Sequence, residues 1–232
     1  MTVPYNGQWF YPPRGEMRVP YKPESPIIKM WKGFSDAVAQ FKQNGTNCQL
    51  KVFPDHSTIE LWSRHKIDAR TGKSSPSGEP SQIKNYVLTG KMREEVLDMT
   101  PKGVWTVYNC ELMHSKTTTV KNTLYFFDVL VWQGQHLISV EYADRYRIIE
   151  GLLKNRYFPI DLPEIDGKLY IAENISPSAW DKAWSEAVKS PYCEGLVLKR
   201  MGAVSRLQYG DREKNNSGFL CRVRKPQKNF RF

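Results

Sequence analysis

The feature that most constrains the fold is a series of short segments with the composition of β-strands, which recur along most of the chain. Residues 48–53 (CQLKVF) place Cys48, Leu50 and Val52 on one face, and residues 57–64 (STIELWSR) resume the alternation after the turn PDHS. These two segments predict a β-hairpin. Further strands rich in β-branched and aromatic side chains are predicted at residues 104–113, 123–132, 194–200, 203–209 and 219–225.

Helical patterns are fewer and lie between the strand segments. Residues 176–190 (SPSAWDKAWSEAVKS) begin with Pro177 and repeat Trp180, Trp184 and Val188 at four-residue spacing, which indicates an amphipathic helix. Shorter helices are predicted at residues 35–41 (SDAVAQF, with Ser35 as the N-cap), 90–99 and 143–155.

This mixture predicts an α+β fold of largely antiparallel sheets with flanking helices. The 232 residues contain no repeat and no long linker, so we expect one domain spanning 1–232. Residues 1–30 are rich in Pro, Tyr and Gly and predict an extended arm, while the polar segment 68–85 predicts a surface loop. Because no apolar run could span a bilayer and no signal segment is visible, we expect no membrane association and a cytoplasmic location, in a cell or an infected host.

Basic residues outnumber acidic ones, and the formal net charge is +10. From residue 199 to the end, ten Lys and Arg accompany two acids, which suggests a polyanionic partner such as nucleic acid, with a solubilising basic surface as the equal alternative on charge alone. The four cysteines are far apart and the four histidines lack ligand spacing, so neither a zinc site nor a disulfide framework is expected. Thiols packed as small apolar groups are the preferred interpretation.

One lysine stands directly before a polar turn, in residues 42–47 (KQNGTN). Gly45 allows a backbone conformation that a Cβ would forbid, and the side chains of Thr46 and Asn47 can bond to the turn or to a ligand. From this hexapeptide alone, an ordinary turn beside a solvated Lys42 is the simpler interpretation. The charged residues downstream are equally ambiguous when each is taken alone, whereas their order and spacing together are informative.

In that order, the segments resemble the motifs of the covalent nucleotidyltransferase superfamily, which comprises ATP-dependent DNA ligases, RNA ligases and mRNA capping enzymes. The nucleophile motif K-x-D/H/N-G is matched at residues 42–45, and the strand motif E-G-x-V-x-K is matched fully at residues 194–199. The resemblance covers roughly residues 40–228 and implies the adenylyltransferase (ATP-grasp-like) catalytic domain of ligases.

Four further segments carry this resemblance. The Ser-Arg element corresponds to Ser63-Arg64, and the F-D-x-L strand is matched at residues 127–130. The D-G-E-L strand is similar to residues 109–112 (NCEL), and the terminal K-x-K to residues 222–224 (RVR), where arginine replaces both lysines. An arginine can still grip phosphate, but it cannot readily act as a neutral amine.

The resemblance implies roles for individual residues. Lys42 would be the catalytic nucleophile that accepts AMP from ATP, assisted by the cations of Lys199, Arg222 and Arg224. The nucleotide would contact Asn44, Gly45, Asn47, Arg64, Glu111, Phe127 (stacked on adenine), Glu194 and Lys199. Glu194 would also help to hold Mg²⁺ or Mn²⁺. The nucleic acid strand would contact Arg64, Arg222, Arg224, Lys225 and Lys228.

The family reaction proceeds from lysyl-AMP to an adenylated 5′-phosphate and then to a sealed phosphodiester. Attack on ATP needs an unprotonated amine, so burial or neighbouring cations must lower the pKa of Lys42. The G-T-N ending after the nucleophile resembles the RNA ligase 2 type and the RNA-editing ligases, so we expect an RNA ligase. Residues 109–112, 127–130 and 142–153 resemble DNA ligases, and a small DNA ligase or a ligase of mixed substrates is the alternative.

Two other functions are compatible with the same motifs. Guanylyl transfer in mRNA capping is one, and a non-catalytic nucleic-acid-binding protein on this scaffold, favoured only by the R-x-R replacement, is the other. The chain ends ten residues after Arg222, so we expect no C-terminal OB domain and a minimal ligase or catalytic core that acts as a monomer.

Overall fold

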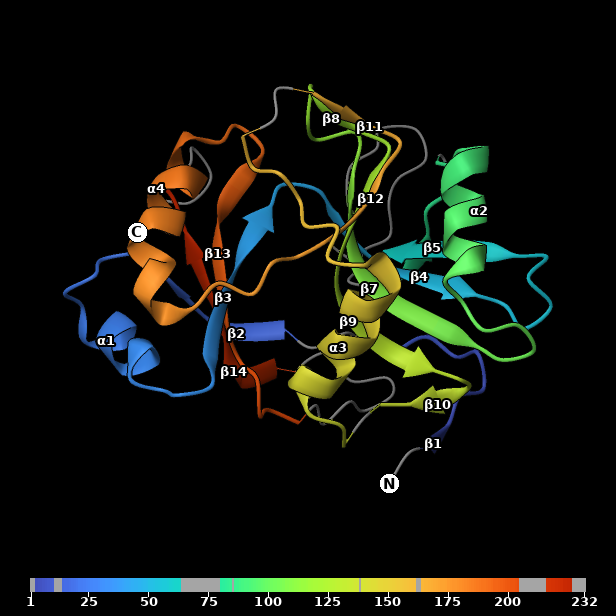
Figure 1. Ribbon diagram of the computed structural model, residues 1–232, viewed down its shortest axis with the longest axis horizontal. Helices are drawn as coiled ribbons and strands as arrows, with labels where there is room; N and C mark the ends of the chain where they lie inside the picture. The colour runs from blue at the N-terminus through green and yellow to red at the C-terminus, as the bar shows by residue number, and fades with distance from the viewer. Residues whose placement is uncertain are drawn as a thin grey trace.

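The computed structural model describes residues 3–10, 14–63, 80–84, 86–137, 139–161, 164–204 and 216–226. Figure 1 shows two sheets beside each other, a smaller one flanked by helices α1 (Pro26–Lys32) and α4 (Trp180–Lys189) and a larger one flanked by α2 (Gly90–Asp98) and α3 (Tyr142–Leu153). This is the predicted α+β architecture. Among the helices of these residues, none combines the length and hydrophobicity needed to cross a bilayer.

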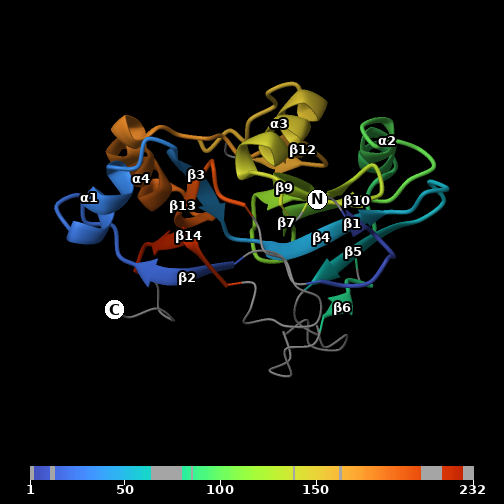
Figure 2. The same cartoon turned by 90° about the horizontal axis from the view of Figure 1, so that it is seen from below.

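The larger sheet has eight strands in the order β1-β10-β9-β7-β4-β5-β6, with β12 added beside β9. Its strands are β1 (Val3–Pro4), β10 (Gln135–His136), β9 (Thr123–Trp132), β7 (Thr106–Met113), β4 (Thr46–Val52), β5 (Ile59–Ser63), β6 (Ser81–Gln82) and β12 (Leu169–Ile171). The predicted hairpin is confirmed, since β4 and β5 pair antiparallel with Leu50 opposite Leu61. Cys48, Leu50 and Val52 are buried in a core with residues of α2 and α3. Figure 2 shows both helices on one side of the larger sheet.

The smaller sheet has four strands in the order β2-β14-β13-β3. They are β2 (Arg14–Val19), β14 (Asn216–Arg224), β13 (Cys193–Arg200) and β3 (Ala37–Gln43), and β2 runs parallel to β14. A separate ribbon joins β8 (Val120–Lys121) to β11 (Ile165–Asp166), and the 3₁₀ turn Pro177–Ala179 leads into α4.

Alternation along these strands gives the smaller sheet two different faces. Ala37, Ala39 and Phe41 of β3 pack with Leu196, Leu198, Cys221 and Val223 against α1 and α4, where Trp31 and Trp180 are almost fully buried. Gln40 and Lys42 alternate with these residues and therefore lie on the other face, from which the Gln40 side chain reaches Tyr142 of α3. This second face is the one directed toward the larger sheet.

The chain crosses from the smaller sheet to the larger one within three residues. Strand β3 ends at Gln43 and β4 begins at Thr46, so the segment KQNGTN is the connection between the sheets. Lys42 therefore lies where the sheets meet. The simpler interpretation, a solvated lysine beside a turn that joins two strands of one sheet, does not describe this position.

Several predicted elements differ from the structure. The helix predicted at residues 35–41 is wrong, because residues from Ala37 onward form β3 and pair with β13, with Ala37, Ala39 and Phe41 in the core beneath α1 and α4. The arm 1–30 is extended only in part. It supplies β1 and β2 to the two sheets, and it ends in α1, whose N-cap Ser25 accepts a hydrogen bond from the Ile28 amide.

The buried face of α4 also differs from the predicted one. Ala183 and Ala187 share it with Trp180, whereas Val188 is 48% exposed. Most of the predicted strand 203–209 and of the loop 68–85 lies outside the described residues.

Candidate active site

Lys42 and Glu194 form an ion pair at the point where the sheets meet. The Lys42 Nζ lies 2.5 Å from Oε2 of Glu194, and Nη2 of Arg224 lies 3.2 Å from the same oxygen. Strand register explains the cluster, because Gly195 pairs with Lys42 on one side and with Arg224 on the other. Side-chain exposures of 16%, 14% and 11% for Lys42, Glu194 and Arg224 leave the group partly open to a ligand.

Two glycines allow this close packing. A Cβ on Gly195 would lie 2.0 Å from the Val223 carbonyl oxygen, and its φ of +138° is one that side chains disfavour. A Cβ on Gly45 would lie 2.6 Å from the Leu112 carbonyl oxygen. Gly45 is thus needed for the close approach of β7 rather than for the left-handed backbone that its turn suggested.

A second carboxylate and a second lysine hold the crossing segment. Oε1 of Glu111 accepts a hydrogen bond from the Gly45 amide at 3.2 Å, and Lys116 Nζ donates to the Gly45 carbonyl oxygen at 2.5 Å. Glu111 was predicted as a site residue, whereas Lys116 was missed because it follows β7 and belongs to no recognisable motif.

The surroundings of Glu194 keep it ionised. Burial raises its pKa, but the charge and hydrogen bond of Lys42 and the charges of Arg224 and Lys116 outweigh burial, so the net pKa lies below the usual value. The carboxylate therefore remains an anion among cations throughout the neutral range.

Further cations line the same face of the smaller sheet. Arg222 pairs with Val197 across β13, and it alternates with the core residues Cys221 and Val223. On the other side of β14, the parallel strand β2 places Arg18 opposite Arg222. Arg18 was missed because the arm was not expected to join this sheet.

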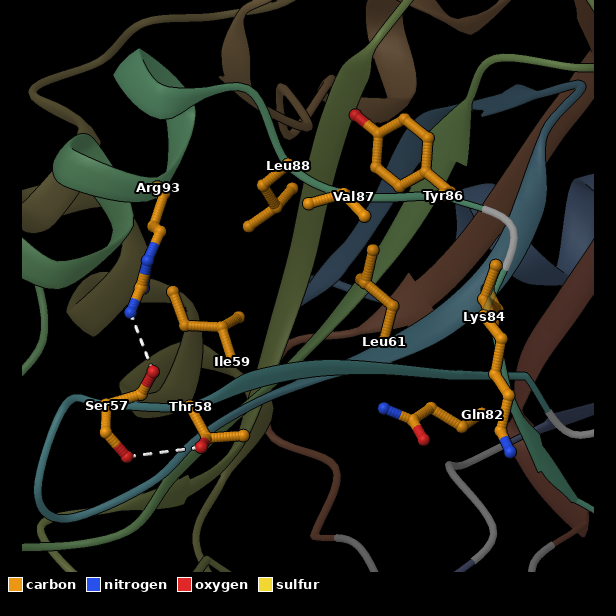
Figure 3. Close-up of a pocket in the computed structure, with 11 residues that line it drawn as sticks. Ser57, Thr58, Ile59, Leu61, Gln82, Lys84, Tyr86, Val87, Leu88 and Arg93 are labelled. Atoms are coloured by element: carbon orange, nitrogen blue, oxygen red, sulfur yellow. Dashed lines mark hydrogen bonds between the residues drawn. The ribbon is translucent and has the colours of Figure 1, made fainter.

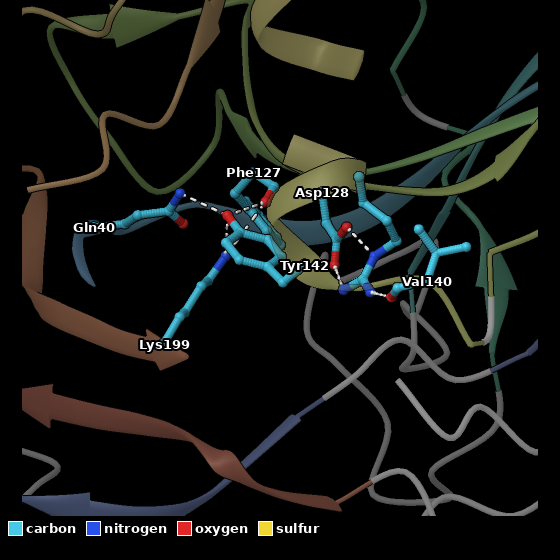
Figure 4. Close-up of polar contacts among 7 residues, drawn as sticks. Gln40, Phe127, Asp128, Val140, Tyr142 and Lys199 are labelled. Carbon is cyan, nitrogen blue, oxygen red and sulfur yellow. Dashed lines mark hydrogen bonds and ion pairs between the residues drawn. The ribbon is translucent and has the colours of Figure 1, made fainter. Parts of the chain in front are cut away.

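Lys199 lies on this face as well, but in closed surroundings (Figure 4). Its Nζ donates to the Tyr142 hydroxyl at 3.0 Å and to the Phe127 carbonyl oxygen at 3.3 Å. It stands 4.3 Å from the centre of the Tyr142 ring and 5.1 Å from that of Phe127. Burial lowers the pKa of Lys199 to about 7, although the charge of Asp128 acts in the opposite direction.

Asp128 and Arg145 form a buried ion pair beside Lys199. Nε and Nη2 of Arg145 donate to the two carboxylate oxygens at 2.8 and 3.0 Å, and Nη1 donates to the Val140 carbonyl oxygen at 2.6 Å. This bidentate pair ties α3 to β9 at the residue that follows Phe127.

The remaining predicted site residues are distributed unevenly. The backbone N–H of Asn44 donates to the Tyr192 carbonyl oxygen. The side-chain Nδ2 of Asn47 donates to Oδ1 of Asn109 within the larger sheet. Lys225 Nζ donates to the carbonyl oxygens of Ser190 and Ala187, which places it at the C-terminal end of α4. Arg64 and Lys228 lie outside the described residues.

The cysteines pack behind the site. All four are free and buried, which confirms their predicted role as small apolar groups. Cys48 and Cys110 lie opposite each other on β4 and β7, with their sulfur atoms 3.5 Å apart.

A hollow of about 410 Å³ lies elsewhere, between β5, residues 82–84 and 86–88, and α2 (Figure 3). Its lining includes Ile59, Leu61 and Val87 together with Lys84 and Arg93, but none of the predicted site residues that the structure describes. Arg93 donates to the backbone carbonyl oxygens of His56 and Ser57, so its charge is partly engaged within the protein.

The donor set at Lys42 fits a metal that is shared with a substrate. No group of three or more His, Cys, Asp and Glu side chains that could hold a metal occurs in the described part of the chain. Magnesium, however, is commonly held by one or two carboxylates plus the phosphate oxygens of a substrate. Glu194 on β13, with Glu111 on β7 of the larger sheet, could provide that kind of partial site.

Comparison with known proteins agrees with this geometry. Residues 22–216 match the family model described as "ATP dependent DNA ligase domain". No curated protein was found whose sequence matches the chain.

Two solved structures are similar in fold. A mycobacterial DNA ligase D complexed with ATP and MES is 16% identical, with a TM-score of 0.52, and the match covers 90% of this chain and 59% of that one. The ligase domain of LigD from M. tuberculosis is 15% identical, with a TM-score of 0.53, and the match covers 91% of this chain and 59% of that one. The chain therefore spans about three fifths of the length of these two structures. Because the family model covers most of the chain, the protein belongs to the family of ATP-dependent DNA ligase domains.

Proposed function

We propose that the protein is an ATP-dependent polynucleotide ligase in which Lys42 becomes covalently linked to AMP. The observation that carries this proposal is the Lys42 amine, which is partly exposed and lies beside Glu194 on a face lined with Arg18, Arg222 and Arg224. One nucleophilic amine among several cations suits attack on a phosphate ester, since those cations stabilise the charge that builds up on phosphate.

The first step forms lysyl-AMP. The ion pair between Lys42 and Glu194 opens, the amine releases its proton to water, and its lone pair attacks the α-phosphorus of ATP. A P–N bond forms as the bond to pyrophosphate breaks. Arg224 on β14, which shares the Glu194 carboxylate with Lys42, and Lys199 on β13 are the candidates for binding the phosphate oxygens.

The next two steps transfer AMP and seal the strand. The 5′-phosphate of a nucleic acid strand attacks the phosphorus of lysyl-AMP and frees Lys42, and a 3′-hydroxyl then displaces AMP to form the phosphodiester. A magnesium ion held by Glu194 would neutralise phosphate oxygens when it is bound. Phe127 is half-buried and offers a ring on which adenine can stack.

We propose DNA as the strand that is sealed. The family model is described as that of DNA ligases, and both solved structures are titled as DNA ligase or LigD ligase domains. RNA is the second candidate, favoured by Asn47, which completes the K-x-N-G-T-N segment. The Asn47 amide is engaged with Asn109 inside the larger sheet, so it provides weaker support for RNA than the sequence alone suggested.

A nick-sealing assay tests both parts of the proposal. Wild-type protein and Lys42→Ala are incubated with ATP, Mg²⁺ and duplexes that carry one nick in all-DNA, all-RNA or hybrid strands. We expect the wild type to seal the all-DNA nick and Lys42→Ala to seal none. Sealing of RNA nicks alone would overturn the DNA assignment. Binding of nicked duplexes without adenylation or sealing would overturn the ligase function in favour of a non-catalytic binding protein.

A further inference from the structure

The hydroxyl of Tyr142 joins three elements of the candidate site. It accepts hydrogen bonds from Gln40 Nε2 at 2.8 Å and from Lys199 Nζ at 3.0 Å, and it donates to the Phe127 carbonyl oxygen at 2.9 Å (Figure 4). Gln40 is on β3 two residues before Lys42, Lys199 is on β13, and Phe127 is on β9. One phenol therefore links the strand of Lys42, the Lys199 amine and the backbone of Phe127.

This hydroxyl has no remaining capacity for hydrogen bonding. A phenol donates once and accepts at most twice, and all three positions are used here. The hydroxyl is buried, and burial raises the pKa of Tyr142 well above its usual value, so it remains a neutral donor and acceptor. A saturated, buried hydroxyl holds its three partners in one arrangement.

The arrangement also fixes where the Lys199 amine lies. Two of its hydrogen bonds point to the Tyr142 hydroxyl and the Phe127 carbonyl oxygen, and the amine stands over the faces of both rings. The charged groups around it are Asp128 on β9 and Arg145 on α3, which are paired with each other. On β3 the residue in register with Lys199 is Val38, and the uncharged Gln40 reaches the same hydroxyl, while β14 places Leu220 in register with Lys199.

We propose that Tyr142 is a positioning residue, whose hydroxyl holds the Lys199 amine against Phe127 and connects that amine to the strand that carries Lys42. This proposal rests on the ligase function proposed above, in which Lys199 contacts the nucleotide. Tyr142 itself need not touch the substrate. It acts through Lys199, because a hydroxyl acceptor favours the ammonium over the neutral amine and so helps Lys199 to keep its proton.

Tyr142→Phe is the direct test, because it removes the hydroxyl and keeps the ring. Gln40 keeps its hydrogen bond to Asn174 and Lys199 keeps the one to Phe127, so the variant retains partners for the groups it exposes. Tyr146→Phe is the matched control. Tyr146 lies one turn further along α3, is also buried, and donates one hydrogen bond to the Ala172 carbonyl oxygen.

The first measurement is kcat/KM for self-adenylation as a function of pH, because this quantity reports the ionisations of the free enzyme. For the wild type, a falling limb near pH 7 would mark the loss of the Lys199 proton. In Tyr142→Phe we expect this limb at lower pH and a rate about tenfold below wild type at pH 8. In Tyr146→Phe we expect the wild-type profile. Superimposable profiles for Tyr142→Phe and wild type would overturn the proposal.

The second measurement separates this proposal from the proposed function. NMR titration of ¹³C-labelled lysine side chains follows Lys199 directly, and the signal that disappears in Lys199→Met identifies it. We expect the Lys199 transition at lower pH in Tyr142→Phe than in wild type or Tyr146→Phe, whether or not the protein ligates. An unchanged transition would refute the role of Tyr142, whereas a shifted transition in a protein that never forms an adenylate would refute the ligase function instead.

Discussion

Two lysines on one face of the smaller sheet lie in opposite surroundings. Lys42 is paired with the Glu194 carboxylate at 2.5 Å and its side chain is 16% exposed. Lys199 is almost fully buried and is held by a hydroxyl, a carbonyl oxygen and two aromatic rings. The neighbouring groups therefore decide what each amine can do. An ionic partner that can be displaced suits a nucleophile, while burial suits a cation whose charge responds to pH.

The largest expected effect is on activity, after replacement of the carboxylate that pairs with Lys42. Glu194→Gln leaves Lys42 and Arg224 without the carboxylate that they share, and it removes the candidate metal ligand. We expect self-adenylation to fall about 100-fold or more, measured by transfer of label from ATP. Glu186→Gln is the control, because Glu186 is half-exposed and lies 3.9 Å from Lys182. Equal self-adenylation rates for the two variants would show that Lys42 needs no carboxylate beside it.

The backbone beside Lys42 gives the next effect. In Gly195→Ala, the new methyl group would meet the Val223 carbonyl oxygen at 2.0 Å and the φ of +138° would be strained. We expect a loss of about 3 kcal/mol in the free energy of unfolding, measured in urea. Gly151→Ala is the matched control, because it lies in α3 with nothing within 4 Å, and there alanine should stabilise by about 0.5–1 kcal/mol. A neutral Gly195→Ala would contradict the close pairing of β13 with β14.

Replacing each lysine by arginine compares the two surroundings directly. An arginine cannot lose its charge, so Lys199→Arg forces a permanent cation into a buried site. We expect this variant to lose about 2 kcal/mol or more of unfolding free energy at pH 7.5. Lys42→Arg keeps its carboxylate partner and should change stability by less than about 1 kcal/mol. Equal losses would mean that the two sites do not differ in polarity.

The smallest expected effect is on the pH dependence of stability. The folded pKa of Lys199, about 7, lies below the unfolded value of 10.5. Between these values the unfolded chain binds more protons than the folded one, so this group makes stability rise with pH. Relative to Lys199→Met, we expect the wild type to gain about 1 kcal/mol between pH 7 and pH 8 in urea titrations. Parallel curves would show that Lys199 is not buried as described.

The sequence predicted most strands of the two sheets and several residues of the site, but not all of them. The strands β4, β5, β7, β9 and β13 followed from alternation and composition, and the resemblance of the motif series assigned Lys42, Glu194 and Lys199 to one site. Residues 35–41 were mistaken for a helix because Ser35 resembles an N-cap, although the period of two at Ala37, Ala39 and Phe41 indicated a strand. Strand pairing with β13 outweighs the local helix propensity of these residues.

Residues that long-range pairing brings to the site were missed. Arg18 reaches it only because β2 pairs with β14, some two hundred residues later in the chain. Tyr142 lies just before the helix predicted at residues 143–155, and its three hydrogen bonds come from segments that only the fold brings together. No periodicity or spacing in the sequence encodes such contacts.

The most direct test of Lys42 as the nucleophile is to locate AMP on the protein. Protein freed of any prior adenylate is incubated with ATP and Mg²⁺, digested, and mapped by mass spectrometry, with Lys42→Ala treated alongside. We predict a single AMP adduct on the peptide that carries Lys42, none on the peptide that carries Lys199, and none in Lys42→Ala. An adduct on Lys199 or another lysine, or a wild-type protein that forms no adduct, would contradict the assignment of Lys42 as the nucleophile.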